Sequence, residues 1–314
     1  MTGAAVIGVD LGGTTLAAGL VAADGRVLSH LREPTHGRGP ATALATLLAL
    51  VDRLIGSARE QGLELAGIGI GVPGTVDAER GAVGRDIHYV PDLASVPLGP
   101  LVAERVGMPV FVDNDVNVLA LGEWMFGAGR GVRSLVMLAV GTGVGGGIIL
   151  DGRVVRGHAG FGGELGHVPI NYDGRACICG GRGCLKAYVS GTDIAREGAQ
   201  RLKREVTATE VFQQAAAGDP VARELAAEVC EALGAGLAII VNGLNPERLL
   251  VAGGVAESLK PLERDIRASL ARYAFAQALA GTSFDILILD KGATVRGGAA
   301  LVHYETHRRK GDAP

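Results

Sequence analysis

One histidine and three cysteines lie close together in the second half of the chain, at His167, Cys177, Cys179 and Cys184. Three thiolates and one imidazole make a complete tetrahedral ligand set for Zn²⁺. Because the protein would fill all four positions, the pattern predicts a structural zinc site and disfavours a zinc hydrolase, which needs an open position. Ordinary thiols beside a surface histidine are the weaker alternative, since glycines between the cysteines permit the tight loop that this spacing requires.

Glu164 stands three residues before His167, so a metal ion there would hold the loop that carries this carboxylate. We expect Glu164 to contact the substrate. His167 could bind zinc through one ring nitrogen and touch the substrate through the other. Cys230 stands apart in a helical pattern and is interpreted as a core residue.

A second cluster, Asp113-Asn114-Asp115-Val116-Asn117, follows a short apolar strand and precedes a helix. Carboxylates and amides at a strand end belong at the mouth of an α/β cleft. One carboxylate could take the proton from a substrate hydroxyl while Asn114 fixes that hydroxyl. A helix N-cap is the alternative. Two acids and two amides exceed what a cap needs, and both roles can hold at once.

Two glycine-rich turns each follow a predicted strand directly. In the first, at residues 10–15, backbone N–H groups beside Gly12 and Gly13 can cradle phosphate oxygens, and Thr14 and Thr15 add hydroxyls. Asp10 can hold Mg²⁺ through water. The alternative is an ordinary tight turn with a capping aspartate.

The second glycine-rich turn, GTGVGGG, occupies residues 141–147. It is not a Walker A motif, because no Gly-Lys-Ser or Gly-Lys-Thr follows. It contains G-x-G-x-x-G but runs into a strand, whereas a dinucleotide fingerprint opens a helix. Two glycine turns that face one another can grip a polyphosphate from both sides, and this pairing favours a nucleotide site.

The composition is that of a globular protein large enough for two cores: 314 residues, 48% apolar and 20% charged, with a net charge of −3. The absence of a basic field argues against nucleic acid as a partner. The N-terminus lacks the basic region of an export signal, and the longest uncharged run, at 134–150, contains five glycines. We therefore expect a cytoplasmic protein that does not contact membranes.

The elements that must position these residues repeat along the chain. Three strands are expected at residues 5–10, 15–22 and 26–32, and the same order recurs about 127 residues later at 134–140, 148–150 and 153–156. The turn sequence DGRV occurs at both 24–27 and 151–154. We interpret this as an internal repeat of a three-strand meander. Chance is the alternative, since Asp-Gly turns are common.

Further helices are expected near residues 44–55, 116–125, 207–217, 219–244, 257–274 and 295–309, and strands at 67–71, 110–112, 249–252 and 286–289. Strands that alternate with helices indicate an α/β fold. The repeat predicts two lobes with a cleft between the glycine turns. We place the N-terminal lobe at residues 1–117 and the C-terminal lobe at 118–291, and the last helix, about 292–310, could pack back on the first lobe.

Together these segments resemble the ROK family of sugar kinases, especially bacterial glucokinases, over nearly the whole chain. The resemblance rests on GVDLGGT (8–14), GVPG (71–74), DNDVN (113–117), GTGVGGG (141–147), GGELGH (162–167), CICGGRGCLK (177–186) and VAGGV (251–255). It implies a two-lobed actin-like ATPase (ribonuclease H-like) fold whose duplicated lobes close on ATP and a sugar, and a homodimer or homotetramer.

The resemblance also implies roles for single residues. Asp115 is the implied catalytic base, and the implied sugar contacts are Gly74, Asn114, Asp115, Glu164 and His167. The implied ATP- and phosphate-binding residues are Asp10, Gly12, Gly13, Thr14, Thr15, Gly141, Thr142, Gly143, Gly253 and Gly254. The implied reaction is ATP-dependent phosphorylation of a hexose at its 6-hydroxyl, with Mg²⁺ beside ATP and glucose the first expectation.

Lys186 departs from the family pattern, which has a glutamate that accepts hydrogen bonds from the sugar at this position. An ammonium group only donates. Lys186 could point away while another group serves, or it could recognise a different substrate, such as another hexose or an amino or N-acetyl sugar.

Alternatively, the protein could bind sugar without efficient catalysis, as a regulator. That function is disfavoured because Asp10 and Asp115 are retained and because the phosphate motif begins at Gly8, which leaves no room for a preceding DNA-binding domain.

Overall fold

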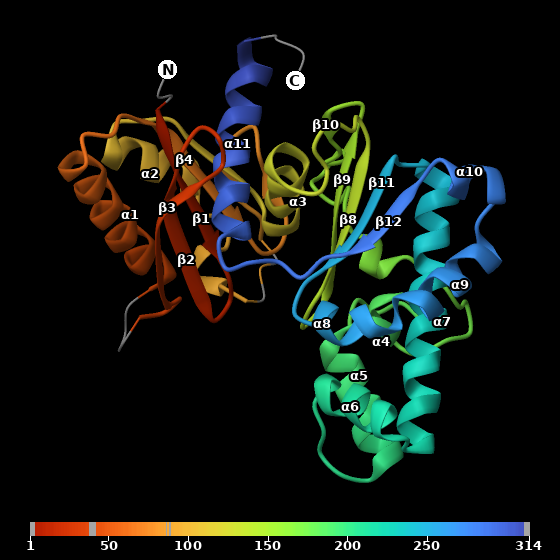
Figure 1. Cartoon of the computed structure of the whole chain (residues 1–314). Helices are drawn as coiled ribbons and strands as arrows, with labels where there is room; N and C mark the ends of the chain where they lie inside the picture. Colours follow the sequence, from red (N-terminus) through yellow and green to blue (C-terminus); the bar gives the residue numbers. More distant parts are fainter. Residues whose placement is uncertain (1–3, 38–41, 86, 88, 311–314) are drawn as a thin grey trace. The chain divides into compact units, whose positions relative to one another are not determined.

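The computed structural model describes residues 4–37, 42–85, 87 and 89–310 (Figure 1). The chain divides into two compact units. The first comprises Met1–Arg133, Gly147–Gly162 and Asp290–Pro314, and the second comprises Ser134–Gly146 and Gly163–Leu289. This division extends the first unit beyond Asn117 and groups the C-terminal segment with it. The lobe boundaries of 1–117 and 118–291 stay predictions.

Five strands form the sheet of the first unit, in the order β3-β2-β1-β4-β7. β1 (Ala5–Leu11), β2 (Thr15–Val21) and β3 (Val27–Pro34) are an antiparallel meander, as the sequence predicted. β4 (Leu65–Val72) and β7 (Val110–Asn114) run parallel to β1. The register therefore places Asp10, Gly71 and Asp113 in one row across the three parallel strands.

One face of this sheet packs on α1 (Ala43–Glu60), and α2 (Leu98–Val106) extends the same core. The Thr42 side chain caps α1 by accepting a hydrogen bond from the Ala45 N–H. Leucines of α1 and alternate residues of β1 are buried together: Leu47, Leu50, Leu54, Ile7, Val9 and Leu11. Since side chains alternate along a strand, Gly8 and Asp10 point to the opposite face.

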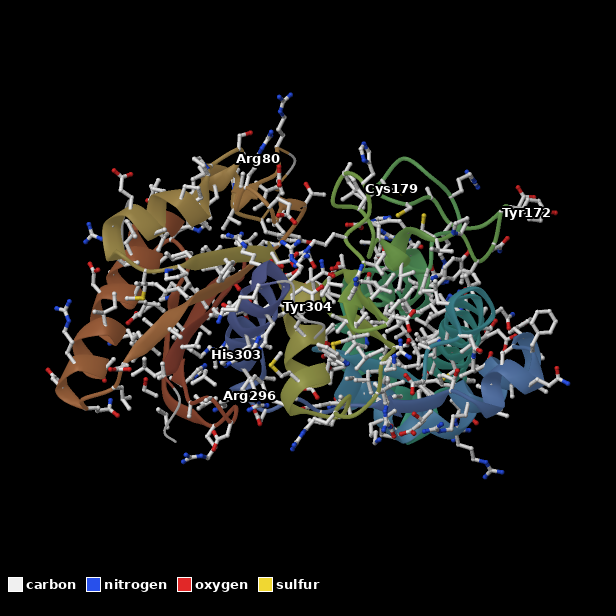
Figure 2. The ribbon with its side chains drawn as sticks, turned by 90° about the horizontal axis from the view of Figure 1, so that it is seen from above. Arg80, Tyr172, Cys179, Arg296, His303 and Tyr304 are labelled. Atoms are coloured by element: carbon white, nitrogen blue, oxygen red, sulfur yellow. The ribbon has the colours of Figure 1, made fainter. Side chains whose placement is uncertain are left out.

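That opposite face is covered by α11 (Ala293–Lys310), which lies beside α3 (Asp115–Phe126) (Figure 1). Two glycines let α11 rest directly on the strands. A Cβ atom on Gly8 would lie 1.9 Å from the carbonyl oxygen of Val295, and one on Gly69 would lie 1.9 Å from that of Gly298. Figure 2 shows the side chains of His303 and Tyr304 further along this helix.

The second sheet has the same layout as the first, in the order β10-β9-β8-β11-β12. β9 (Val144–Leu150) and β10 (Arg153–Val154) are antiparallel, and β8 (Leu135–Val140), β11 (Arg248–Ala252) and β12 (Ser283–Ile286) are parallel. The predicted internal repeat is therefore confirmed. In each copy, two further strands lie parallel to the first strand of the meander and extend the sheet. The division into units falls within β9, between Gly146 and Gly147.

Helices form most of the rest of the second unit: α4 (Lys186–Val189), α5 (Gly191–Leu202), α6 (Ala208–Ala217), α7 (Pro220–Leu244), α8 (Ala256–Leu259), α9 (Glu263–Tyr273) and α10 (Ala276–Ala280). α7 begins as predicted, with Asp219 capping the Ala222 N–H and proline at the first position. Short elements complete the chain: β5 (Val76–Asp77), β6 (Ala82–Val83) and 3-10 turns at Pro91–Leu93, Leu165–His167 and Lys260–Leu262.

Some predicted elements differ from the structure. The strand expected at 286–289 is wrong, because β12 lies at Ser283–Ile286 and ends where that prediction begins. The helix expected at 257–274 is interrupted by the 3-10 turn that contains Pro261. Neither α2 nor α5 was predicted. In the part of the chain that the structure describes, no helix has the length and apolarity needed to cross a membrane.

Candidate active site

The first unit brings Asp10 and Asp115 together at the carboxyl end of its parallel strands. Asp10 is the last but one residue of β1, and Asp115 is the first residue of α3, directly after β7. Burial raises the pKa of Asp115 to about 7, and the negative charge of Asp10 adds to this rise. The two carboxylates therefore interact, as expected for residues that share one reaction centre.

Asp10 is held from two sides. Burial raises the pKa of its carboxyl group, while a hydrogen bond from Thr294 and the charge of Arg32 partly oppose the rise. Thr294 lies in the first turn of α11, so this helix contributes a hydrogen bond to Asp10. No sequence motif near Thr294 predicted this contact. Two neighbouring carboxylates in a partly buried position make a favourable environment for a divalent cation, which relieves their repulsion.

Asn114 joins the start of α3 to the loop after β4. Its Oδ1 accepts hydrogen bonds from the N–H groups of Val116 (2.9 Å) and Asn117 (3.2 Å), and its Nδ2 donates to the carbonyl oxygen of Gly74 (3.1 Å). Asn114 is thus a helix cap, and it meets Gly74, another predicted sugar contact in this unit. A role in fixing a sugar hydroxyl stays a prediction for both residues.

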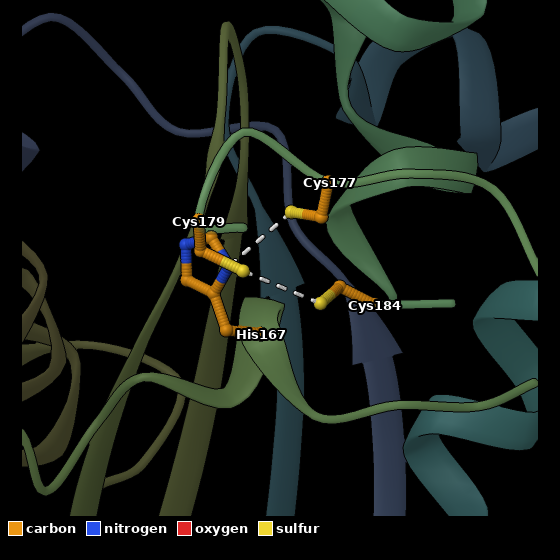
Figure 3. A group of neighbouring side chains, drawn as sticks. All are labelled: His167, Cys177, Cys179 and Cys184. Atoms are coloured by element: carbon orange, nitrogen blue, oxygen red, sulfur yellow. Dashed lines mark hydrogen bonds between the residues drawn. The ribbon is translucent and has the colours of Figure 1, made fainter. Parts of the chain in front are cut away.

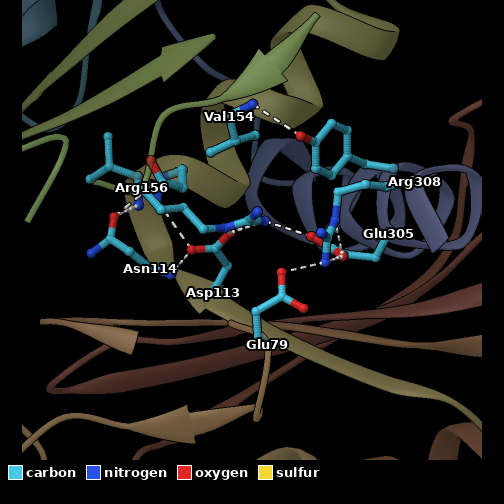
Figure 4. A network of polar contacts seen from close by, with 10 residues as sticks. Glu79, Asp113, Asn114, Val154, Arg156, Glu305 and Arg308 are labelled. Carbon is cyan, nitrogen blue, oxygen red and sulfur yellow. Dashed lines mark hydrogen bonds and ion pairs between the residues drawn. The ribbon is translucent and has the colours of Figure 1, made fainter. Parts of the chain in front are cut away.

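The second acid of this cluster, Asp113, has a different environment from Asp115. It is 1% exposed, and its carboxylate accepts hydrogen bonds from the Asn114 N–H (2.8 Å), from Asn117 Nδ2 (3.1 Å) and from the Arg156 guanidinium (2.8 Å) (Figure 4). Protein groups therefore fill the hydrogen-bonding capacity of the Asp113 carboxylate. Sequence reasoning missed Arg156, because 43 residues separate it from Asp113.

The first glycine turn is tightly closed. The Gly12 N–H donates to the carbonyl oxygen of Thr15 (3.0 Å), and Thr35 binds both ends of the turn, through its hydroxyl to the Gly12 oxygen (2.6 Å) and through its N–H to the Thr14 oxygen (3.0 Å). The side chain of Thr14 is exposed. Hydrogen bonds within the turn and from Thr35 therefore hold its shape, and the exposed Thr14 is available to a ligand.

In the second unit, the structure brings the predicted ATP-binding residues of two segments together. The Gly141 N–H donates to Gly143 (2.9 Å), closing the turn after β8, and the Val255 N–H donates to Val140 (3.0 Å). Gly253 has a φ of 105°, and a Cβ atom there would lie 2.5 Å from the Val140 oxygen. Glycine at this position is what allows the turn after β11 to meet the turn after β8.

The four predicted metal ligands converge in the second unit (Figure 3). All four ligand atoms lie within 4.8 Å of one another. Cys177 Sγ is 3.5 Å from His167 Nδ1, and Cys179 Sγ is 3.7 Å from Cys184 Sγ. A tetrahedral zinc with bonds of about 2.3 Å to sulfur and 2.0–2.1 Å to nitrogen would separate its ligands by about 3.6–3.8 Å. The donor set therefore fits this metal.

The loop between the ligands is shaped by its own backbone. The Cys177 N–H donates to Gly181 (2.9 Å), and the Gly180 N–H donates to Cys177 (3.0 Å). Glu164 and His167 lie on one 3-10 turn, where the His167 N–H donates to the Glu164 carbonyl oxygen (3.0 Å). The Glu164 side chain is exposed. His167, one of the four clustered side chains, therefore lies on the same turn from which Glu164 projects.

Lys186 is bound to a buried acid. Its Nζ lies 2.8 Å from Asp193 Oδ2, and the two side chains are 16% and 5% exposed. Asp193 also accepts from the Ser190 hydroxyl and pairs with Arg196 (2.6 Å). Burial raises the pKa of Asp193, but Lys186 and Ser190 outweigh this and leave it lowered. Sequence reasoning did not single out Asp193.

Duplicated sheets that each carry a glycine turn, with paired carboxylates at the end of one of them, define the actin-like ATPase fold. The chain belongs to the ROK family, whose family model matches residues 6–305.

Several relatives support this assignment in detail. A glucokinase of Halalkalibacterium halodurans is 33% identical over 323 residues, which cover 98% of this chain and 97% of the relative. The crystal structure of a ROK hexokinase from Thermus thermophilus is 36% identical, with a TM-score of 0.83 over 97% of this chain and 99% of that one. A ROK glucokinase from Streptomyces griseus, solved with glucose and AMPPNP, is 32% identical, with a TM-score of 0.76 over 95% and 99%. Xylose repressors also match, at lower identity.

Proposed function

We propose that this protein transfers the γ-phosphoryl group of ATP to the 6-hydroxyl of a hexose, with glucose as the first substrate. The observation that carries the proposal is the Asp115 carboxylate, which lies at the head of α3 beside Asp10 and has a pKa raised to about 7. A base whose pKa is near the working pH is well matched to accept a hydroxyl proton. Family membership supports the same reaction.

In the proposed mechanism, Asn114 and Glu164 fix the sugar, and Asp115 accepts the proton of its 6-hydroxyl. The sugar oxygen forms a bond to the γ-phosphorus, the bond from that phosphorus to the bridging oxygen breaks, and ADP leaves with the electron pair. The turns at Gly12–Gly13 and Gly141–Gly143 would hold the phosphates through groups other than the Gly12 and Gly141 N–H, which donate within their own turns. Phosphoryl transfer depends mainly on such positioning and on charge neutralisation. Asp10 would hold Mg²⁺ through water, and the ion would supply positive charge to the phosphates.

We also propose that the His167–Cys177–Cys179–Cys184 cluster holds a structural Zn²⁺. All four ligands come from the protein, so the metal would take no part in the reaction. Its role would be to fix the turn that carries Glu164. The cytoplasmic location and the homodimer or homotetramer stay predictions.

The Lys186–Asp193 pair supports the interpretation that Lys186 points away from the sugar, because its charge is already matched by a buried carboxylate. A sugar-binding regulator remains the second candidate, and Lys186 is the observation that favours it. The two functions differ in one measurable way, because only the kinase releases ADP when sugar is added.

The test is an ADP-release assay on zinc-replete protein with glucose, mannose, fructose, glucosamine and N-acetylated hexosamines. We expect sugar-dependent ADP release that is fastest with glucose. Sugar binding by titration calorimetry without any ADP release would refute the kinase and favour the regulator.

A further inference from the structure

Arg156 ties three segments of the first unit together (Figure 4). Its guanidinium donates to Asp113 Oδ2 (2.8 Å) and to Glu305 Oε1 (2.7 Å), and its side chain is 17% exposed against 2% for each acid. Burial disfavours its charged form, but Asp113 and Glu305 outweigh this and raise the pKa of the guanidinium. Arg156 is therefore a permanent cation between two buried anions.

The Asp113 arm of this network leads to the reaction centre. Asp113 uses its other oxygen, Oδ1, to hold the Asn114 N–H (2.8 Å) and Asn117 Nδ2 (3.1 Å). These two residues flank Asp115 in the sequence. The orientation of the Asp113 carboxylate therefore sets where α3 begins, and Arg156 fixes that orientation.

The Glu305 arm leads to α11. Glu305 also pairs with Arg308 (2.8 Å), and Arg308 pairs with Glu79 (2.7 Å) in the loop between β5 and β6. The Arg156 guanidinium lies 5.7 Å from the ring centre of Tyr304, whose hydroxyl accepts a hydrogen bond from the Val154 N–H (3.1 Å). The side chain of Arg156 is thus fixed on several sides.

The backbone of Arg156 holds the segment that precedes Glu164. The Gly162 N–H donates to the Arg156 carbonyl oxygen (2.9 Å). A Cβ atom on Gly162 would lie 2.5 Å from the Val155 oxygen and 2.6 Å from the Arg156 carbonyl carbon, so the loop closes tightly on Arg156. Gly162 is two residues before Glu164.

We propose that Arg156 is a positioning residue for catalysis, which sets the turn of Asn114 and Asp115 through the carboxylate of Asp113. The proposal rests on the proposed kinase function. Arg156 contacts neither reacting group in this scheme, and its effect passes through Asp113. Misplacement of a reacting group by about 1 Å can lower a rate about 100-fold.

The variant that tests this is Arg156→Lys, which keeps the positive charge but cannot bridge two carboxylates with a planar fork. The matched control is Arg201→Lys, because Arg201 also bridges two carboxylates, Glu197 and Glu228, at 2.6 Å each, but belongs to the second unit, whereas Asp115 belongs to the first. We expect Arg156→Lys to lower kcat for glucose by at least about 10-fold, with KM for ATP within about twofold. The control should keep kcat within about twofold.

A double-mutant cycle asks whether Arg156 acts through Asp113. If it does, Asp113→Asn combined with Arg156→Lys lowers kcat no further than the more damaging single change. Additive losses would overturn this route. An unchanged kcat in Arg156→Lys, or an equal loss in Arg201→Lys, would overturn the positioning role while the kinase function stands.

Hydrogen exchange on the full-length protein gives a readout that does not depend on catalysis. The N–H groups of Val116 and Asn117 are held by Asn114, so we expect them to exchange faster in Arg156→Lys by at least about 10-fold and to be unchanged in Arg201→Lys. Unchanged exchange at these two amides would also overturn the proposal. If the wild-type protein shows no kinase activity, the proposed function fails, and the exchange result still decides whether Arg156 positions this turn.

Discussion

Lys186 and Asp193 form an ion pair that is largely removed from solvent, with 2.8 Å between Nζ and Oδ2. The lysine stands where the family resemblance implies a glutamate, yet its charge is balanced within the second unit by this acid. A simple exchange of Lys186 for glutamate would place two carboxylates together. Neutral and conservative variants are therefore the better probes of this position.

We predict that Lys186→Met lowers stability more than activity. In this variant Asp193 loses Lys186 but keeps its hydrogen bond from Ser190 and its ion pair with Arg196. Because the buried carboxylate keeps these partners, we expect the free energy of unfolding to fall by only about 1–3 kcal/mol. The kcat and KM for glucose should stay within about threefold of wild type. Lys186→Arg is the control for retained charge. A rise in glucose KM of more than about 30-fold would instead place Lys186 against the sugar.

Asp115→Asn should abolish most turnover while sugar binding survives. The amide cannot accept the hydroxyl proton, and general-base assistance is typically worth about 10²–10⁴-fold. In the wild type, kcat/KM should rise with pH through about 7, where the buried carboxyl group ionises. Steady-state rates across pH 5.5–9 and calorimetric glucose titration of the variant check both statements. Near-wild-type turnover by a folded variant would contradict the assignment of the base.

The same substitution should stabilise the ligand-free protein above pH 7. The pKa of Asp115 is raised from 3.8 to about 7, so its protonated form is favoured by folding. Its contribution to stability is complete below pH 3.8 and is lost as pH rises to about 7. We expect Asp115→Asn to exceed the wild type by roughly 1–4 kcal/mol at pH 8 and to match it at pH 4. Denaturant unfolding at the two pH values measures this, and equal stability at pH 8 would argue against the raised pKa.

Metal analysis should find about one zinc per chain, because the cluster offers one complete ligand set. Cys184→Ser should lose the metal and lower the melting temperature, since Cys184 is 3% exposed and its loop would lose its anchor. Cys230→Ser is the matched control, because Cys230 is 5% exposed but lies outside the cluster. Full zinc content in Cys184→Ser would exclude the proposed ligand set.

Gly69→Ala should destabilise the first unit by about 3 kcal/mol, the upper end of the range for overpacking, because the new methyl group would meet the backbone of α11. Gly243→Ala provides the comparison, since a Cβ atom there has no neighbour within 4 Å. We expect that control to be neutral or to gain about 0.4–1 kcal/mol. Chemical denaturation of the two variants is sufficient, and a tolerated Gly69→Ala would mean that α11 does not rest on β4 as described.

Structural features that depend on residues adjacent in the sequence could be predicted from the sequence. The glycine turns, the repeated meander and the start of α7 each depend on neighbouring residues, such as Asp219 and Pro220. The convergence of His167 with the three cysteines could also be predicted, because Cys177, Cys179 and Cys184 lie within one short loop and their spacing is specific. Metal binding by this cluster stays a prediction.

Contacts between distant residues could not be predicted in this way. Arg156 has partners 43 and 149 residues away, and no pattern near it differs from an ordinary surface arginine. The hydrogen bond from Thr294 to Asp10 likewise depends on how α11 packs on β1. Similarly, residues 286–289 are apolar, as a buried strand requires. The strand forms at Ser283–Ile286 instead, because those residues pair with β11.

The position of α11 has a consequence for synthesis on the ribosome. The glycine-bearing face of β1 and β4 is covered by α11, and the chain between Val72 and Ala293 must be made before this helix. At about 5–20 residues per second, this stretch takes roughly 10–45 s to make. The nascent chain therefore displays an open sheet face for that interval, and chaperones that bind exposed strands would find their target there before the last helix emerges.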